Sequence, residues 1–147
     1  MNSPEIISTV LAQWNLCLKT IHPERNLLGS PERTLFRTAF EDESGGIFVI
    51  EQIAPNRREK KLYISRTLEH LHTDGLKQVV PCLKTPTGQS LVFYDGAWWQ
   101  VFPFIDGTPL DRPRYIRDAR KGEALACFLG ELSRHATRLP RDCLLYT

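Results

Sequence analysis

An Asp95-Gly96 pair between two short apolar runs constrains the fold of this 147-residue chain more than any other feature of its sequence. Such a pair favours the two-residue turn of a β-hairpin, because both positions of that turn need backbone angles that most residues avoid. The run that follows the turn contains two neighbouring tryptophans. The flanking runs, 90–94 and 97–102, therefore predict two adjacent antiparallel strands.

Three more runs predict strands. The runs 34–40 and 47–53 flank a polar, glycine-containing turn and predict a second hairpin. The run 79–84 predicts a strand that leads through a Pro-Thr-Gly turn to 90–94. The segment 16–33 is rich in polar residues and prolines, which is typical of turns. Because tight turns join most neighbouring strands, we expect one antiparallel sheet of five strands.

Apolar residues at helical spacing predict three helices, at 4–15, 56–73 and 114–138. Ser3 is suited to cap the first helix, since a serine side chain can accept a hydrogen bond from a free backbone N–H of the first turn. Gly75 is suited to end the second helix, where a left-handed residue commonly follows the last turn. The chain is therefore expected to combine a sheet with three helices.

Composition and charge exclude several classes of protein. The chain is 41% hydrophobic and 24% charged, which is ordinary for a globular domain with a core. Its net charge of +2 is too small to indicate a nucleic acid or an anionic membrane as partner. No apolar run approaches the roughly 20 residues of a membrane span, and the N-terminus does not resemble a signal peptide. The four cysteines are widely spaced, which argues against a zinc site or disulfides and favours reduced thiols in a cytoplasmic protein.

Three blocks of sequence carry a resemblance to a known superfamily. They are Gly45–Ile53, then Trp98–Gly107 with the sequence WWQVFPFIDG, and then Gly122–Leu132 with the sequence GEALACFLGEL. Two strands, a crossing helix, three strands and a proline-bearing connector into a helix form the layout of a kinase small lobe. The chain thus resembles the N-terminal lobe of the aminoglycoside phosphotransferase and choline/homoserine kinase superfamily.

The resemblance implies a protein-kinase-like α+β fold with an antiparallel five-stranded sheet and a crossing helix. An N-terminal helix precedes the sheet, and a C-terminal helix follows the hinge. In this interpretation residues 1–102 form the kinase-like N-lobe, 103–113 the hinge, and 114–147 the truncated helical start of the C-lobe. An exposed apolar stripe on the last helix would then allow a homodimer.

The resemblance also implies an adenine site at the hinge. Phe102 would take the gatekeeper position behind the base, and Pro103 and Ile105 would offer a backbone carbonyl and a backbone N–H to its edge. These groups suit adenine, which needs one acceptor, one donor and flat apolar walls. Ile50, Val80 and Phe104 would be neighbours of those walls. The alternative is that an aromatic strand followed by prolines is only core and loop.

Glu51 departs from the superfamily pattern. Kinases of this kind carry a lysine on the third strand that reaches the phosphates and pairs with a helix glutamate, and Glu51 occupies the matching position. One hypothesis is an inverted pair, in which Arg58 or Lys61 of the following helix supplies the cation. The alternatives are that Glu51 points to solvent at the sheet edge, or that the register differs by one or two residues.

A weak counterpart of the phosphate loop precedes the first predicted hairpin. It contains one glycine, within Gly29–Thr34. Hydroxyls of Ser30 and Thr34, with Arg33 or Arg37, could contact phosphate. The alternative is an ordinary surface turn.

The superfamily places its catalytic aspartate in a His-x-Asp loop of the C-terminal lobe and its metal-binding aspartate further on. One His-x-Asp match, His72-Thr73-Asp74, lies at a predicted helix end in the small lobe and is interpreted as a chance match. The resemblance therefore implies the ATP-binding-lobe part of a small-molecule phosphotransferase that is inactive alone. The parent enzyme would use ATP and Mg²⁺ to phosphorylate a hydroxyl of a small acceptor whose pocket belongs to the larger lobe. Two alternatives stay open: a non-catalytic, kinase-like protein-interaction module, and an unrelated α+β domain.

Overall fold

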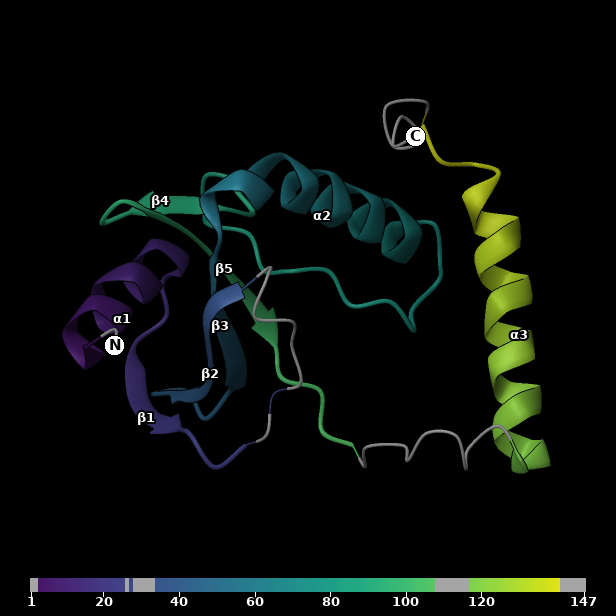
Figure 1. Cartoon of the computed structure of the whole chain (residues 1–147), viewed down its shortest axis with the longest axis horizontal. Coiled ribbons are helices and arrows are strands. Elements are labelled where there is room, and N and C mark those ends of the chain that lie inside the picture. Colours follow the sequence, from purple (N-terminus) through teal and green to yellow (C-terminus); the bar gives the residue numbers. More distant parts are fainter. Residues whose placement is uncertain (1–2, 26, 28–33, 108–116, 141–147) are drawn as a thin grey trace. The chain divides into compact units, whose positions relative to one another are not determined.

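The computed structural model describes residues 3–25, 27, 34–107 and 117–140. Figure 1 shows its helices and strands. The α-helices are α1 (Pro4–Leu11), α2 (Arg58–Thr73) and α3 (Ala119–Ala136), and the short 3-10 helices are η1 (Ala12–Trp14) and η2 (Pro55–Arg57). The strands are β1 (Leu18–His22), β2 (Thr34–Asp42), β3 (Ile47–Ile53), β4 (Val92–Tyr94) and β5 (Ala97–Pro103).

The chain divides into two compact units. The first comprises Met1–Ser65 and Pro81–Phe104 and contains the whole sheet. The second comprises Arg66–Val80 and Ile105–Thr147 and contains α3. The boundary between the units falls within α2.

The sheet has five antiparallel strands in the order β1-β2-β3-β5-β4. This confirms the predicted fold class. The turn between β4 and β5 is the tight hairpin that its sequence indicates, since Asp95 and Gly96 have φ of 49° and 72°. Positive φ at both central residues gives the turn a twist that matches the twist of the strands on either side.

The predicted strands differ from the observed strands at two places. The segment 16–33, predicted as turns, contains strand β1, which pairs with β2 at the edge of the sheet. The segment 79–84, predicted as a strand, is irregular. Pro81 has no N–H to donate to a neighbouring strand, and a hydrogen bond from Leu83 N–H to the Val101 carbonyl at 2.8 Å joins this segment to β5. The predicted total of five strands was correct, but one of its members was not.

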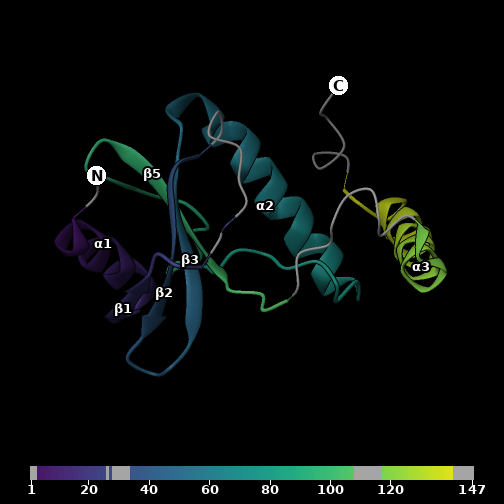
Figure 2. The same ribbon diagram turned by 60° about the horizontal axis from the view of Figure 1, so that its bottom comes forward.

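Helix α1 covers one face of the sheet and closes the main core. Ser3 caps it as predicted, by accepting a hydrogen bond from Ile6 N–H at 3.4 Å. The helix buries its inward side against large residues of the strands, and Trp14 of η1 donates to the Leu83 carbonyl at 3.2 Å. The buried members of this core are Ile7, Val10, Leu11, Trp14, Phe40, Ile50, Val92, Ala97, Trp99 and Val101. The first turns of α2 lie on the opposite face of the sheet (Figure 2).

The second unit has a small core of its own. Helix α2 ends in a Schellman motif, in which Leu76 N–H reaches the Leu71 carbonyl and Gly75 N–H reaches the His72 carbonyl. Gly75 has φ of +111°, as expected for the glycine that ends the helix. Leu71, Leu76 and Val79 are buried together, and Leu68, Phe128, Leu132 and Leu139 pack against them.

Helix α3 begins later than predicted. Its first residue is Ala119, and the side chain of Asp118 accepts hydrogen bonds from Arg120 N–H and Lys121 N–H. Residues 114–116 of the predicted helix lie outside the described residues. Leu125 and Leu129 of α3 are exposed, so part of the predicted apolar stripe faces outward.

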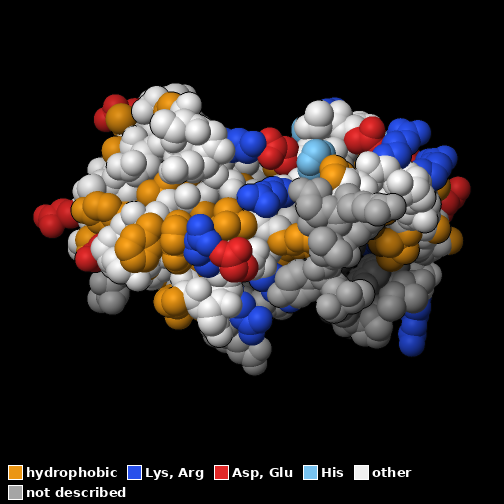
Figure 3. Space-filling model, turned by 90° about the horizontal axis from the view of Figure 1, so that it is seen from above, with side chains coloured by type: hydrophobic (Ala, Val, Ile, Leu, Met, Phe, Trp, Pro, Cys, Tyr) orange, Lys and Arg blue, Asp and Glu red, His pale blue; other side chains and the backbone are white. Residues whose placement is uncertain are grey.

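The described side chains on the face drawn in Figure 3 do not form a large area of one charge. On the face drawn in Figure 3, Lys and Arg side chains are mixed with Asp and Glu side chains, and the hydrophobic side chains form several separate groups. Among the described residues, none of the helices combines the length and the apolar character that crossing a membrane requires.

Replacement of Gly75 by alanine should destabilise the second unit, because an L-residue at φ +111° is strained. We expect Gly75→Ala to lower the free energy of unfolding by about 1–2 kcal/mol. Gly130 provides the matched control, since it lies inside α3 with open space at its Cβ position. Gly130→Ala should raise the free energy of unfolding by about 0.5–1 kcal/mol. Urea unfolding followed by circular dichroism measures both changes. If both substitutions raised the free energy of unfolding, or both lowered it, the role of Gly75 as the left-handed residue that ends α2 would be contradicted.

Candidate functional site

A polar cluster lies in the middle of the sheet, on the face opposite α1. The strand register aligns Arg37 of β2, Glu51 of β3 and Gln100 of β5 as direct neighbours. Because side chains alternate between the two faces of a strand, residues opposite one another in register share a face. Lys61 in the early part of α2 reaches the same point.

The carboxylate of Glu51 is the centre of the cluster, and its side chain is completely buried. Its Oε1 accepts hydrogen bonds from the Thr34 hydroxyl and from Arg37 Nη2, the latter at 2.7 Å. Its Oε2 accepts from Lys61 Nζ at 2.9 Å and from the Gln100 side-chain amide. Each carboxylate oxygen thus receives two donors, which satisfies the acceptor capacity of the group.

The surroundings of Glu51 hold it in the ionised form. Burial by itself raises the pKa of Glu51, but the hydrogen bonds from Thr34 and Lys61, the charge of Lys61 and the hydrogen bond from Gln100 outweigh it. The pKa is lowered to about 2. Two cations, Arg37 and Lys61, face this one carboxylate.

The inverted pair is confirmed with Lys61 as the helix cation. The alternative in which Glu51 points to solvent is wrong, because none of its side chain is exposed. Arg58, the other cation considered, pairs instead with Glu59, and its guanidinium lies 4.5 Å from the ring centre of Trp98. Such an arrangement over an indole is a favourable cation–π contact.

The residues predicted to contact adenine follow the cluster along β5. Phe102 and Pro103 are half-buried at the end of this strand, and Phe102 lies opposite Val49 of β3. Phe104 N–H donates to the Ile47 carbonyl at 3.0 Å, and the Arg25 guanidinium lies 4.5 Å from the ring centre of Phe104. One broad face of the Phe104 ring is therefore already covered by a cation.

The two remaining residues of the predicted site are placed differently. Ile105 belongs to the second unit, and its side chain is 67% exposed. Ile50 is fully buried in the core beside α1, on the face of the sheet opposite the Glu51 carboxylate. A ligand on the Glu51 face would therefore have Val49 rather than Ile50 next to Phe102. The role of these residues in binding stays a prediction.

Sequence reasoning missed Gln100 as a member of the cluster. The signal was present, because Gln100 is the only polar side chain in the run from Trp98 to Phe102. The role of Gln100 becomes clear only from the pairing of β3 with β5, which places Gln100 opposite Glu51. Thr34 and Arg37, proposed as phosphate contacts, lie in this cluster, whereas Ser30 and Arg33 lie outside the described residues.

The cluster does not fit a magnesium site. Mg²⁺ in proteins is held by carboxylate oxygens and water, and both oxygens of Glu51 are occupied by donors. In the parts of the chain that the structure describes, no group of three or more His, Cys, Asp or Glu side chains could hold a metal ion.

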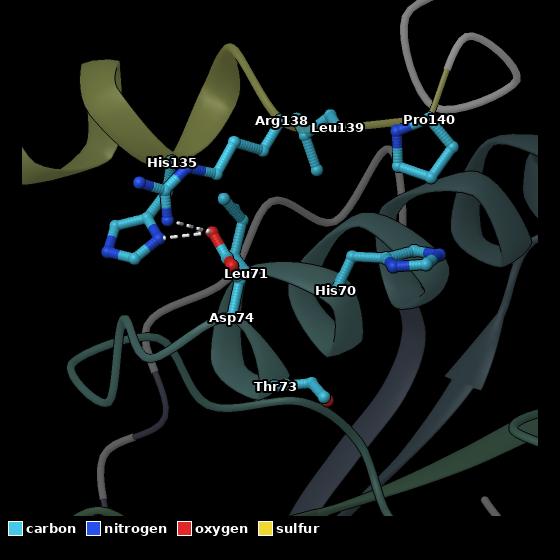
Figure 4. A pocket seen from close by; sticks show the side chains of 8 residues that line it. All are labelled: His70, Leu71, Thr73, Asp74, His135, Arg138, Leu139 and Pro140. Atoms are coloured by element: carbon cyan, nitrogen blue, oxygen red, sulfur yellow. Dashed lines mark hydrogen bonds and ion pairs between the residues drawn. The ribbon is translucent and has the colours of Figure 1, made fainter.

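The second unit contains a hollow of about 290 Å³ near the ends of α2 and α3. Figure 4 shows His135 and Arg138 of the α3 side both reaching Asp74. His135 Nδ1 lies 2.6 Å from Asp74 Oδ2, and this hydrogen bond lowers the pKa of Asp74. The other lining residues are His70, Leu71, Thr73, Leu139 and Pro140. Asp74 is already paired with His135 and Arg138, so its carboxylate is not left unpaired for a ligand.

The low pKa of Glu51 predicts a loss of stability in acid. An acid whose pKa is lowered by folding stabilises the protein above its unfolded-state pKa, and the effect is lost as the pH falls toward the folded-state value. The free energy of unfolding of the first unit should therefore fall between pH 4.5 and pH 2. In Glu51→Gln this dependence should be weaker, with the two proteins converging near pH 2.

Tryptophan fluorescence during urea unfolding measures this dependence selectively, because Trp14, Trp98 and Trp99 all lie in the first unit. Asp118→Asn is a suitable control, since Asp118 is a carboxylate of lowered pKa in the second unit. Parallel curves for wild type and Glu51→Gln would contradict the prediction.

No family model matches the sequence, and no curated protein matches it. Solved structures do match the fold, and the three described next each have a TM-score of 0.53. An aminoglycoside phosphotransferase from Alicyclobacillus acidocaldarius is 17% identical, with 76% of this chain and 30% of that chain covered. A spectinomycin phosphotransferase in complex with ADP and spectinomycin is 13% identical, with 80% and 35% covered. An amicoumacin kinase in complex with AMP-PNP and Ca²⁺ is 15% identical, with 78% and 34% covered.

The chain spans about a third of the length of these structures. Identity at this level establishes a shared fold and does not by itself establish a shared function. The five-stranded antiparallel sheet and its helices therefore have the fold of the kinase-like N-lobe of aminoglycoside-phosphotransferase-type structures.

Proposed function

We propose that this chain is the ATP-binding-lobe part of a small-molecule phosphotransferase. The observation that carries the proposal is the kinase-like sheet, shared with two structures that hold the adenine nucleotides ADP and AMP-PNP. In this proposal residues 1–102 form the N-lobe, 103–113 the hinge, and 114–147 the start of a C-lobe. The parent enzyme transfers the γ-phosphoryl group of ATP to a hydroxyl of a small acceptor, with Mg²⁺ held by residues beyond the Glu51 cluster.

The chemistry of the β5 end supports an adenine site. Phe102 and Val49 present half-buried apolar surface on the Glu51 face. Phe102 is followed by Pro103, which can offer a carbonyl to the base and has no N–H of its own to satisfy. A pocket for a flat base is typically apolar with a few polar groups that fix its orientation. One lobe covers part of such a ligand, so the affinity of this chain alone is expected to be weak.

The second candidate is a non-catalytic, kinase-like protein-interaction module. The saturated carboxylate of Glu51 favours it, because an acid stands where the resemblance implies a phosphate-binding lysine. A carboxylate that already accepts four hydrogen bonds stabilises the fold whether or not a nucleotide binds. Nucleotide binding therefore distinguishes the two candidates.

Calorimetric titration with ATP and with adenosine tests the proposal. Wild-type protein should bind both saturably, and Phe102→Asp should weaken both by at least about tenfold, because a carboxylate in an apolar base site is desolvated and repels phosphate. The matched control is Phe93→Asp, an aromatic residue of β4 whose side chain is 58% exposed.

Circular dichroism of each variant verifies that the fold is retained. Absence of saturable binding by the wild type at millimolar ATP and adenosine would reject the nucleotide site and favour the interaction module. Equal losses in Phe102→Asp and Phe93→Asp would reject the β5 end as its location.

A further inference from the structure

Helix α3 exposes two leucines outside the core of the second unit. Leu125 and Leu129 are 46% and 52% exposed, whereas Phe128 and Leu132 of the same helix pack against that core. Single exposed leucines are common on folded proteins, but these two lie one helical turn apart and form a continuous patch. The helix therefore has apolar surface that the described residues leave uncovered, and such surface is typical of an interaction site.

Opposite charges flank this patch along the helix. Glu123 precedes it, Arg134 follows it, and both residues are exposed. Within the described part of the chain, no ion pair involves either side chain. The two residues are eleven positions apart, which is close to three helical turns, so they project from the same side of α3. Leu129 lies nearly midway between them.

This arrangement of charges is complementary to itself. When two copies of a helix pack antiparallel about a two-fold axis, a given side of one helix faces the same side of the other. An axis beside Leu129 sets this leucine against its own copy. Because Glu123 and Arg134 lie nearly equally far from Leu129, the same axis sets each glutamate beside the arginine of the other copy. A parallel pair would instead bring like charges together, which is unfavourable.

We propose that α3 packs antiparallel against α3 of a second copy of this chain. Leu125 and Leu129 form the apolar part of the contact, and Glu123 and Arg134 form two symmetric ion pairs at its edge. The helix has 18 residues, and only one side of it takes part, which is fewer than the roughly 20–30 residues a side of a standard interface. We therefore expect a weak dimer with a Kd of about 10–100 μM.

Sedimentation equilibrium of the whole chain over a range of concentrations tests the apolar contact. The mass of the wild type should rise with concentration from that of one chain to that of two. Leu129→Glu should raise the dimer Kd by about tenfold or more, because it sets two like charges against each other at the axis. The matched control is Leu35→Glu, since Leu35 is a 58% exposed leucine of β2 in the first unit. This control should leave the dimer Kd unchanged.

A charge exchange tests the antiparallel orientation. Glu123→Arg and Arg134→Glu, made separately, each replace two attractive contacts by two repulsive ones and should raise the dimer Kd by about threefold or more. The double variant with both substitutions exchanges the partners and restores the attraction. Its Kd should lie within about threefold of the wild-type value.

Each outcome supports or overturns the proposal. A wild type that stays monomeric at every concentration overturns it and leaves the leucines of α3 to a different partner. A dimer that Leu129→Glu does not weaken has its interface elsewhere, and this result overturns the proposal as well. A double variant that dimerises no better than the two single variants contradicts the antiparallel pairing. Circular dichroism and thermal unfolding identify any variant that is misfolded, and none of the substitutions touches the proposed nucleotide site.

Discussion

The buried carboxylate of Glu51 is the interaction on which the first unit depends. It lies on β3, the central strand, and joins β2 through Thr34 and Arg37, β5 through Gln100, and α2 through Lys61. A charged group in such a position is tolerated only when its partners are complete, and removing one partner of a buried pair typically costs about 3–5 kcal/mol. The cluster therefore fixes both the register of β2, β3 and β5 and the position of the first turns of α2 on the sheet.

This polar centre gives the two faces of the sheet different roles. On one face, α1 and the large apolar residues of the strands form a closed core that includes Ile50 and Trp99. On the other face, ionic contacts and half-buried apolar side chains lie next to one another. A face of the second kind can exchange solvent for a ligand without disturbing the core. The proposed base contacts of Phe102 and Val49 lie there.

Local rules predicted much of the fold correctly, and their errors have clear causes. The Asp95-Gly96 hairpin, the Ser3 cap and the Gly75 helix end depend on the conformational preferences of a few neighbouring residues. Strand β1 was missed because its pairing with β2, more than ten residues away, determines its conformation. The apolar run at 79–84 was predicted as a strand because periodicity does not register the N–H that Pro81 lacks.

The sequence by itself determined the three helices, the two hairpins and the turns within them, because backbone angles and hydrophobic period are local properties. It did not determine the full order of the strands, since β1 was missed and 79–84 is irregular. It also placed an acid on β3 and cations in the helix that follows. Only the tertiary structure decided which groups meet, since Glu51 joins residues 10, 14 and 49 positions away in the chain. It also decided which face of the sheet each side chain occupies. These choices follow from strand register, which depends on the packing of the whole sheet rather than on any one segment.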